Sequence, residues 1–198
     1  MNVDYCFTPV SPWAFLGHER FTALLKETGA TVTVRPVDYG AIFPVSGGLP
    51  LAKRAPQRQA YRLVELKRFS DFLGIPMHLQ PAHFPVNGNP AAHLILAADA
   101  AHGSAAALDL AGRVGTAIWA QQRNVADAAV LAELLAEAGL PASLMDAAAL
   151  DAAAARYATL TAEARDLGVF GAPTYVIDGE LFWGQDRLDF VQRRLARP

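Results

Sequence analysis

The sequence predicts an α/β protein in which a β-α-β unit at one end of the chain and a β-β-α unit at the other form a single sheet. Within residues 3–37, two segments rich in β-branched and aromatic residues flank a helical pattern. Residues 174–187 repeat the strand pattern on both sides of a tight-turn pair, and a helical pattern follows. Between these units, residues 42–168 show helical spacing of apolar residues and no strand pattern. The middle of the chain is therefore expected to be an all-helical insertion.

The first unit is predicted from strand composition and from helix start and stop signals. Val3–Phe7 alternates and is rich in Val, Tyr and Phe, which is typical of a strand. Ser11 fits the N-cap of a helix, and Pro12 fits the first helical position, where its missing N–H is not needed. Gly29 ends that helix, and Thr31–Val37 follows as a second strand. A β-α-β unit of this length makes a parallel pair of strands with a right-handed crossover.

The middle of the chain is predicted to be a loop followed by helices. Gly40–Pro56 contains three prolines and several glycines and is expected to be loop-like. Asn124, with Asp127 three residues later, resembles the capped start of a helix. The other helices are expected over residues 57–73, 91–101, 108–122 and 143–166.

The last unit is predicted from a proline, a turn pair and charge placement. Thr174–Ile177 suits a strand, and Asp178-Gly179 suits a two-residue hairpin turn that needs positive φ angles. Pro173 cannot donate a ladder hydrogen bond, so it is expected to open the strand, and its peptide bond is a candidate for the cis form. A closing helix is predicted over Asp186–Arg197, with acidic residues at its start and basic residues at its end.

Composition excludes several classes of function. The 198 residues are 53% hydrophobic and carry a net charge of −2, which gives no general argument for binding nucleic acid or a membrane. A single cysteine, Cys6, rules out an internal disulfide and a thiolate metal cluster. The five histidines show no ligand pairing, so no metal site is expected. The start of the chain has no signal-peptide pattern, and no long apolar stretch is free of charge. We expect a cytoplasmic protein.

Three motifs together carry a resemblance to a known family. They are Phe7–Trp13 with its Ser-Pro-aromatic ending, Gly168–Thr174 with the pattern Gly-Val-Phe-Gly-x-Pro-Thr, and Phe182–Leu188 with Trp-Gly-x-Asp-Arg. The chain resembles the DsbA-like thioredoxin superfamily. Within it, the chain is most similar to the 2-hydroxychromene-2-carboxylate isomerases and to the related kappa-class glutathione transferases.

The resemblance covers the whole chain and implies a domain plan. It implies a thioredoxin-like domain formed by residues 1–40 and 168–198, with residues 41–167 as the helical insertion domain. It also implies a homodimer. The sequence departs from the family at Ala172, where valine is usual, at Thr8-Pro9, where an acidic and an apolar residue are common, and at Gly48, where kappa-class enzymes often carry asparagine.

Ser11 is the predicted catalytic residue. Redox proteins of this fold carry Cys-x-x-Cys at the start of the first helix, but here Ser11–Ala14 contains no thiol, so dithiol chemistry is excluded. What remains is a hydroxyl at a helix N-terminus, a position that favours an anion. The resemblance implies that this anion is the thiolate of glutathione, to which Ser11 donates a hydrogen bond. The alternative is that Ser11 serves only as a helix cap.

The remaining glutathione contacts are implied by the resemblance. The backbone of Ala172, before Pro173, is expected to pair with the cysteine residue of glutathione like an added strand. Asp186 is expected to accept from the γ-glutamyl ammonium, with Gln185 near its carboxylate and Arg187 beside them. The alternatives are an ordinary proline at a strand start, and a helix-capping aspartate with a solvated arginine.

A basic helix face and two tryptophans are candidates for binding the substrate. Arg54, Arg58 and Arg62 are four residues apart, so they share one helix face and form a basic patch with Lys53. Lys53 and Arg54 are the stronger candidates for holding a carboxylate, although a solvated helix face is an equally good interpretation.

Aromatic and amide side chains complete the candidate substrate site. Trp13 and Trp183 are candidates for an apolar wall against an aromatic substrate, the alternative being ordinary core packing. Asn87 is a further candidate for facing the site.

The activity implied by the resemblance is glutathione-dependent conversion of 2-hydroxychromene-2-carboxylate to trans-o-hydroxybenzylidenepyruvate, or of a related cis enone to its trans isomer. Glutathione would act as a cofactor, because reversible addition of its thiolate to the alkene regenerates it. Two alternatives remain open at this stage. One is a kappa-class-like transferase that consumes glutathione on an electrophile, and the other is a thioredoxin-like module that binds without catalysis.

Overall fold

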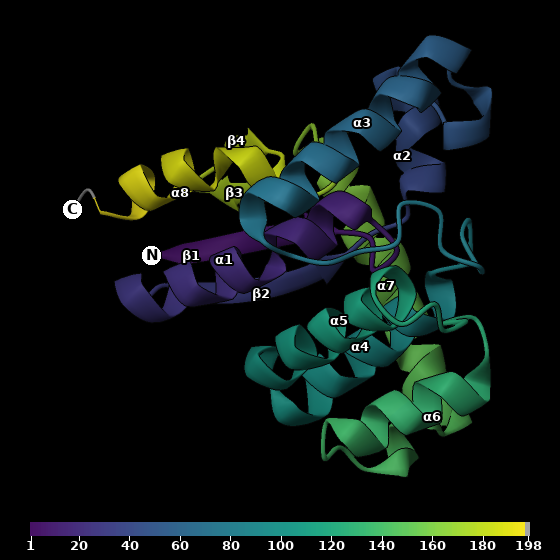
Figure 1. Ribbon diagram of the computed structural model, residues 1–198. Coiled ribbons are helices and arrows are strands. Elements are labelled where there is room, and N and C mark those ends of the chain that lie inside the picture. Colours follow the sequence, from purple (N-terminus) through teal and green to yellow (C-terminus); the bar gives the residue numbers. More distant parts are fainter. Residues whose placement is uncertain (197–198) are drawn as a thin grey trace.

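The computed structural model describes residues 1–196 (Figure 1). It contains a four-stranded sheet, eight α-helices and three short 3₁₀ turns within those residues. In chain order these are β1 Asn2–Phe7, α1 Pro12–Thr28, β2 Thr31–Pro36, α2 Tyr39–Ser46, η1 Leu51–Lys53, α3 Pro56–Leu73, α4 Asn89–His102, α5 Ser104–Trp119, α6 Ala128–Glu137, η2 Ala142–Met145, α7 Ala147–Asp166, β3 Thr174–Ile177, β4 Glu180–Trp183, η3 Gln185–Arg187 and α8 Leu188–Leu195.

The sheet joins the two ends of the chain, as the sequence predicted. Its strand order is β2-β1-β3-β4, with β1 and β2 parallel and the other neighbours antiparallel. Tyr5 at the centre of β1 pairs with Val34 of β2 and with Tyr175 of β3. The hairpin between β3 and β4 turns at Asp178 and Gly179, whose φ angles of 50° and 81° are both positive, as this turn requires.

The two faces of the sheet are covered by different helices. On one face, Phe21 of α1 packs against the rings of Tyr5 and Tyr175 at centroid distances of 4.7 and 4.8 Å. On the other face, Arg35 of β2 pairs with Glu163 of α7 at 2.6 Å. Helices α4, α5 and α7 contact β2, so the helical block lies along that edge of the sheet, as Figure 1 shows. None of the described helices combines the length and apolar composition needed to span a membrane.

Local sequence signals predicted the boundaries of α1 and the end of α3 correctly. The side chain of Ser11 caps α1, and Gly29 ends it in the left-handed conformation with φ of 66°. Gly74 ends α3 in the same way. Every residue from 42 to 168 is described and none lies in a strand, which confirms that the middle of the chain is helical.

The prediction of a loop over residues 40–56 was wrong in its first part, because α2 occupies Tyr39–Ser46. The Asp38 carboxylate caps this helix by accepting from the backbone N–H of Gly40 at 2.7 Å. Tyr39 and Ile42 are buried against the core. These contacts outweigh the one backbone hydrogen bond that Pro44, inside the helix, cannot donate.

Other helix boundaries also differ from the prediction. Helix α5 spans Ser104–Trp119 rather than residues 108–122, and α7 begins at Ala147, after the turn η2, rather than at residue 143. Asp127, not Asn124, caps α6, because its carboxylate accepts from the N–H of Ala129 at 2.9 Å. Asn124 instead accepts from the N–H of Ala126 and closes a turn before the helix. The closing helix predicted from Asp186 begins as the turn η3 and becomes α-helical only at Leu188. The predicted end of that helix at residue 197 lies outside the described residues.

Candidate active site

Ser11 lies where β1 ends and α1 begins, and it is buried with only 6% of its surface exposed. Its hydroxyl oxygen accepts from the N–H of Ala14 at 3.2 Å. Its own N–H donates to the carbonyl of Thr8 at 3.0 Å, which closes the turn that leads into the helix. A hydroxyl that accepts through a lone pair keeps its proton free to donate. The cap and a hydrogen bond to an anion are therefore compatible roles for this side chain.

The Ala172–Pro173 segment lies alongside the end of β1. In the antiparallel pairing of β1 with β3, Thr174 is opposite Cys6. One or two residues before Thr174, the chain therefore reaches the loop that leads from β1 to Ser11. The peptide bond between Ala172 and Pro173 is cis.

Hydrogen bonds hold this cis-proline segment on both sides. The carbonyl of Gly171 accepts from the Thr174 hydroxyl at 2.7 Å and from the Tyr39 hydroxyl of α2 at 2.8 Å. The carbonyl of Pro173 accepts from the N–H of Gly184 at 2.8 Å. The segment is therefore positioned by both α2 and the end of β4. Tyr39, to which the sequence analysis gave no role, is part of this support.

Trp183 covers the cis-proline segment from outside. A Cβ atom added to Gly171 would collide with the indole nitrogen of Trp183, so the ring lies directly over that backbone. The Trp183 ring also meets Phe170 edge-on at 4.7 Å between centroids. Trp183 is 52% exposed and offers an open aromatic surface. Trp13 instead meets Phe69 of α3 edge-on at 5.8 Å, so the two tryptophans contact different elements.

In the turn η3, the side chain of Gln185 is buried and that of Asp186 is exposed. Gln185 is 1% exposed, and its side-chain oxygen accepts from Arg20 of α1 at 3.2 Å. A Cβ atom on Gly17 would lie 2.7 Å from the Cβ of Gln185, so the turn is packed tightly on α1. Asp186 and Arg187 are exposed and form an ion pair at 3.3 Å. The geometry gives Gln185 a supporting position and leaves Asp186 and Arg187 as the accessible polar groups.

The prediction that Arg54, Arg58 and Arg62 share one helix face was wrong for Arg54, because α3 begins at Pro56 and Arg54 precedes it at the end of η1. The basic patch also divides into exposed and half-buried residues. Lys53 and Arg58 are exposed, whereas Arg54 is half-buried and donates to the carbonyl of Leu49 at 2.8 Å. Desolvation, together with the charge of Arg58, lowers the pKa of Arg54. Within residues 1–196, none of the three arginines of this patch, Arg54, Arg58 and Arg62, pairs with a carboxylate.

Arg62 differs from the other two arginines of the patch in its aromatic contacts, which the sequence did not predict. Its guanidinium lies over the rings of Phe84 and Trp119, at 5.4 and 5.9 Å from their centroids. Burial and the nearby charge of Arg54 lower its pKa to about 10. A cation held on aromatic rings beside a second cation and without a carboxylate is suited to receiving an anion. Four-residue spacing had marked this face, but only the tertiary structure distinguishes Arg62 from Arg58.

Asn87 lies in a loop that reaches the Ser11 region. A Cβ atom added to its neighbour Gly88 would lie 2.8 Å from Val10, directly before Ser11. Asn87 is exposed, and its side-chain oxygen accepts from the N–H of Asn89 at 3.1 Å, close to the start of α4. Its side-chain NH₂ therefore remains available at this edge of the site.

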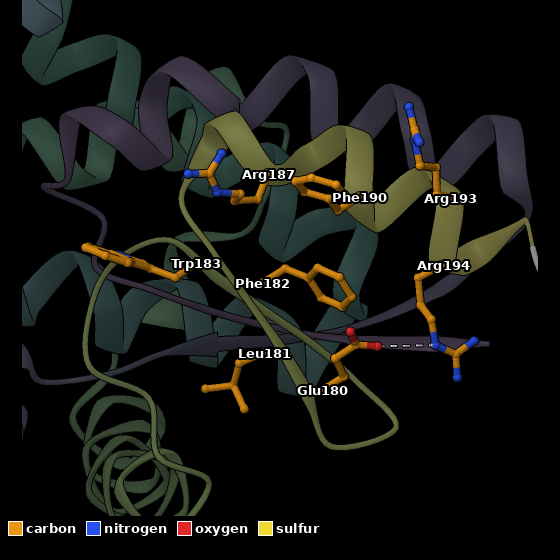
Figure 2. Close-up of a pocket in the computed structure, with 8 residues that line it drawn as sticks. All are labelled: Glu180, Leu181, Phe182, Trp183, Arg187, Phe190, Arg193 and Arg194. Atoms are coloured by element: carbon orange, nitrogen blue, oxygen red, sulfur yellow. Dashed lines mark ion pairs between the residues drawn. The ribbon is translucent and has the colours of Figure 1, made fainter.

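A hollow of about 540 Å³ lies against β4 and α8 (Figure 2). It begins at Trp183 and Arg187, which belong to the predicted site, and continues along Phe182 and Phe190 toward the end of α8. In Figure 2 the guanidinium of Arg187 points toward the Trp183 side of the hollow. The hollow therefore adjoins the exposed polar groups of the C-terminal turn rather than the buried Ser11.

Cys6 is not available for thiol chemistry. It is fully buried in β1, and desolvation is the main cause that raises the pKa of its thiol to about 12. At neutral pH it is therefore an un-ionised, packed side chain.

Comparisons with known proteins agree with this architecture. Residues 2–196 match the model of the DSBA-like thioredoxin domain family. A protein of Sphingobium xenophagum named 2-hydroxychromene-2-carboxylate isomerase is 26% identical over 196 residues, which cover 98% of this chain and 97% of that protein. A solved 2-hydroxychromene-2-carboxylate isomerase superposes with a TM-score of 0.83 at 26% identity, covering 100% of this chain and 95% of the other.

A more distant relative shares only the fold. The cytosolic disulfide reductase DsbM from Pseudomonas aeruginosa, solved with GSH, has a TM-score of 0.71 at 21% identity, and each chain is covered completely. The match of the family model over nearly the whole length places the protein in a family: the chain belongs to the DSBA-like thioredoxin domain family.

Proposed function

We propose that this protein is a glutathione-dependent isomerase that converts 2-hydroxychromene-2-carboxylate to the ring-opened trans-o-hydroxybenzylidenepyruvate, or isomerises a related cis enone bearing a carboxylate. The observation that carries the proposal is a thiol-free active position. Ser11 presents a hydroxyl at the N-terminus of α1, beside the cis-proline segment, where redox members of this fold use cysteine. Full-length similarity to proteins named as isomerases of this substrate supports the same activity.

Several features of the chain suit the binding of glutathione. The N-terminus of α1 favours an anion, and the Ser11 hydroxyl has a proton free to donate to it. Asp186 is exposed and able to accept from an ammonium group, while Arg187 is exposed and able to pair with a carboxylate. The same fold in DsbM accommodates GSH. Opening of the hemiketal ring of 2-hydroxychromene-2-carboxylate breaks its ring C–O bond, passes the hydroxyl proton to the phenolic oxygen, and exposes a cis alkene conjugated to a ketone. When bound, glutathione would supply a thiolate that adds to this alkene, allows rotation about the resulting single bond, and is then eliminated unchanged.

In this proposal the chain's own residues bind, orient and stabilise charge. Ser11 donates a hydrogen bond to the sulfur, which lowers the free energy of the ionised form. The backbone of Ala172 aligns the tripeptide as an added strand. No residue is needed as a general base, because the addition and its reversal leave the substrate's proton count unchanged.

The substrate carboxylate is assigned to the half-buried arginines. Arg54 and Arg62 lack carboxylate partners within the described chain. An anion between them would offset the burial and the repulsion from Arg54 that together lower the pKa of Arg62. The rings of Phe84 and Trp119 beneath Arg62 hold that guanidinium in place. Trp13 and Trp183 are the candidate aromatic surfaces for the ring of the substrate. Lys53, which is exposed, is the weaker choice for the carboxylate.

The proposed chemistry favours a reducing compartment. Glutathione acts here through its free thiol, and the cytoplasm keeps that thiol reduced. We therefore assign the activity to the cytoplasm.

The test follows turnover of 2-hydroxychromene-2-carboxylate by ultraviolet absorbance, with glutathione, without it, and with S-methylglutathione. We expect turnover only with free glutathione, whose concentration stays constant. Loss of glutathione in proportion to product would support a transferase instead. Absence of any turnover, despite glutathione binding by calorimetry, would support a binding module.

Two variants of Ser11 separate catalysis from helix capping. Ser11→Ala removes both the cap and the proton donor, whereas Ser11→Asp keeps a good cap but has no proton to donate at neutral pH. We expect both variants to lose activity, although Ser11→Asp retains the wild-type stability. Full activity in Ser11→Asp would show that Ser11 acts only as a cap.

A further inference from the structure

Strand β4 forms an open edge of the sheet. It is the last strand in the order β2-β1-β3-β4, so it pairs with a neighbour on one side only. Its pairing with β3 sets Trp183 opposite Thr174, and the N–H of Gly184, one residue further on, donates to the carbonyl of Pro173. Hydrogen-bonded and non-hydrogen-bonded pairs alternate along an antiparallel ladder. Trp183 and Leu181 are therefore the residues whose backbone N–H and C=O point away from β3.

The hollow of about 540 Å³ lies along this open edge, on the side of α8. Side chains alternate along a strand, so Glu180 and Phe182 share one face of β4. Arg194 of α8 contacts Glu180 at 3.7 Å, which shows that α8 adjoins this face. Phe182 of the strand and Phe190 of the helix line the middle of the hollow, between its Arg187 end and its Arg194 end, as Figure 2 shows. An apolar side chain entering from the edge would meet both phenyl rings.

Positive charge surrounds this apolar centre. The arginines Arg187, Arg193 and Arg194 line the hollow together with a single carboxylate, that of Glu180. Arg194 is already paired with Glu180, and Arg187 with its neighbour Asp186. Arg193 takes part in none of the ion pairs formed by the described residues. The hollow therefore favours an occupant with acidic groups next to an apolar one.

We propose that β4 and this hollow form a docking site for an extended acidic peptide. The peptide would add a strand to the sheet by bonding to the backbone of Leu181 and Trp183. Its alternate side chains would then face the hollow, with an apolar residue between Phe182 and Phe190. Acidic residues two positions before and after it would lie toward the arginines.

The open backbone favours a peptide over a small aromatic acid as the occupant. Leu181 and Trp183 offer two N–H and two C=O groups along about 7 Å of strand, and only another extended chain matches that spacing. This inference does not depend on the proposed glutathione chemistry.

The test titrates the peptide acetyl-Glu-Val-Phe-Val-Glu-amide into the isotopically labelled full chain and follows amide signals by NMR. Phenylalanine and both glutamates fall on one face of this peptide when it is extended. We expect saturable shifts at the amides of Leu181 and Trp183. Arg193→Glu should raise the dissociation constant about tenfold or more, and so should lysine in place of both glutamates of the peptide. Absence of saturable shifts at about 1 mM peptide would overturn the proposal.

Arg165→Glu is the matched control, because Arg165 is exposed on α7 and the substitution changes the net charge equally. It should leave the dissociation constant nearly unchanged. An equal loss of affinity in both variants would show attraction by net charge alone, against a site at β4.

N-methylated peptides test the bonds to the backbone of β4. Methylation of both valine N–H groups should abolish binding of an antiparallel peptide, and methylation of the phenylalanine N–H should abolish binding of a parallel one. Leu181→Pro removes an outward N–H without removing a bond to β3, so it should weaken binding, with circular dichroism to verify the fold. Full binding by both methylated peptides would overturn the proposal.

Two further measurements separate the other possible occupants. N-acetylphenylalaninate binding as tightly as the peptide would show a site for small aromatic acids. Shifts of the Leu181 and Trp183 amides on dilution of the protein alone would show that a second copy of the chain covers this edge. Either result would contradict the assignment to a peptide.

Discussion

One guanidinium nitrogen of Arg20 donates to both the backbone carbonyl and the side-chain oxygen of Gln185, at 3.3 and 3.2 Å. The two residues are 165 positions apart in the chain. Arg20 also pairs with Asp189 at 3.2 Å, so it ties α1 to the C-terminal turn and to the start of α8. Since α1 carries Ser11 and the turn carries Asp186, this contact sets the relative position of the two ends of the candidate glutathione site.

The first prediction concerns this link. Arg20→Ala should loosen the turn that carries Asp186 and raise the KM for glutathione severalfold, while kcat changes little. Stability should fall by about 1–3 kcal/mol, as is typical when a hydrogen bond to a charged group is lost. Steady-state kinetics and urea unfolding measure the two effects. Arg113→Ala is the control, because Arg113 is equally exposed and pairs with Asp109 on α5. An unchanged KM in Arg20→Ala would contradict the positioning role.

The second prediction concerns the contact between Gly171 and Trp183. Gly171→Ala places a methyl group against the indole, so it should cost about 1–3 kcal/mol of stability. Removing the ring in Gly171→Ala/Trp183→Ala should abolish most of that cost, because the collision no longer exists. A double-mutant cycle by urea unfolding measures the coupling. Equal costs of Gly171→Ala in both backgrounds would contradict the contact.

The third prediction concerns Arg62 and the substrate. Arg62→Gln should raise the KM for a carboxylate substrate about tenfold, because one of two unpaired guanidiniums is lost. It should not reduce stability by more than about 1 kcal/mol, since the repulsion from Arg54 disappears at the same time. Arg58→Gln, on the exposed side of the same helix, should leave the KM nearly unchanged. Similar effects of the two variants on KM would argue against the assignment of Arg62.

The fourth prediction concerns stability at mildly acidic pH. His18 lies between α1 and α5 against Gly112, and burial lowers its pKa below the ordinary value of 6.5. The unfolded chain therefore binds a proton at a higher pH than the folded one does. Stability should be full above about pH 6.5 and fall as the pH drops below that value. Urea unfolding between neutral and mildly acidic pH measures this slope.

His18→Gln should make that slope shallower. Part of the remaining slope is attributed to His93, because burial lowers the pKa of that side chain too. If His18→Gln leaves the pH dependence unchanged, His18 is not protonated on unfolding as proposed.

The sequence by itself determined the parts of the fold that depend on neighbouring residues. Ser11 before Pro12, Gly29 after the helix, and Asp178-Gly179 between two strands act through their own backbone preferences and short-range hydrogen bonds. These signals do not need the rest of the molecule. The serine in the thiol position is equally a local fact, so the exclusion of dithiol chemistry also followed from the sequence.

Tertiary structure decided the features that depend on residues distant in the chain. The proline in α2 predicted a loop, but burial of Tyr39 and Ile42 on the core stabilises a helix there. The packing of Gln185 against Arg20 of α1 could not be read from the sequence, because the two residues meet only in the folded chain. Arg62 became distinct from Arg58 only through the rings of Phe84 and Trp119. Local patterns carry no information about such contacts, because their free energy arises from burial between segments that meet only in the folded chain.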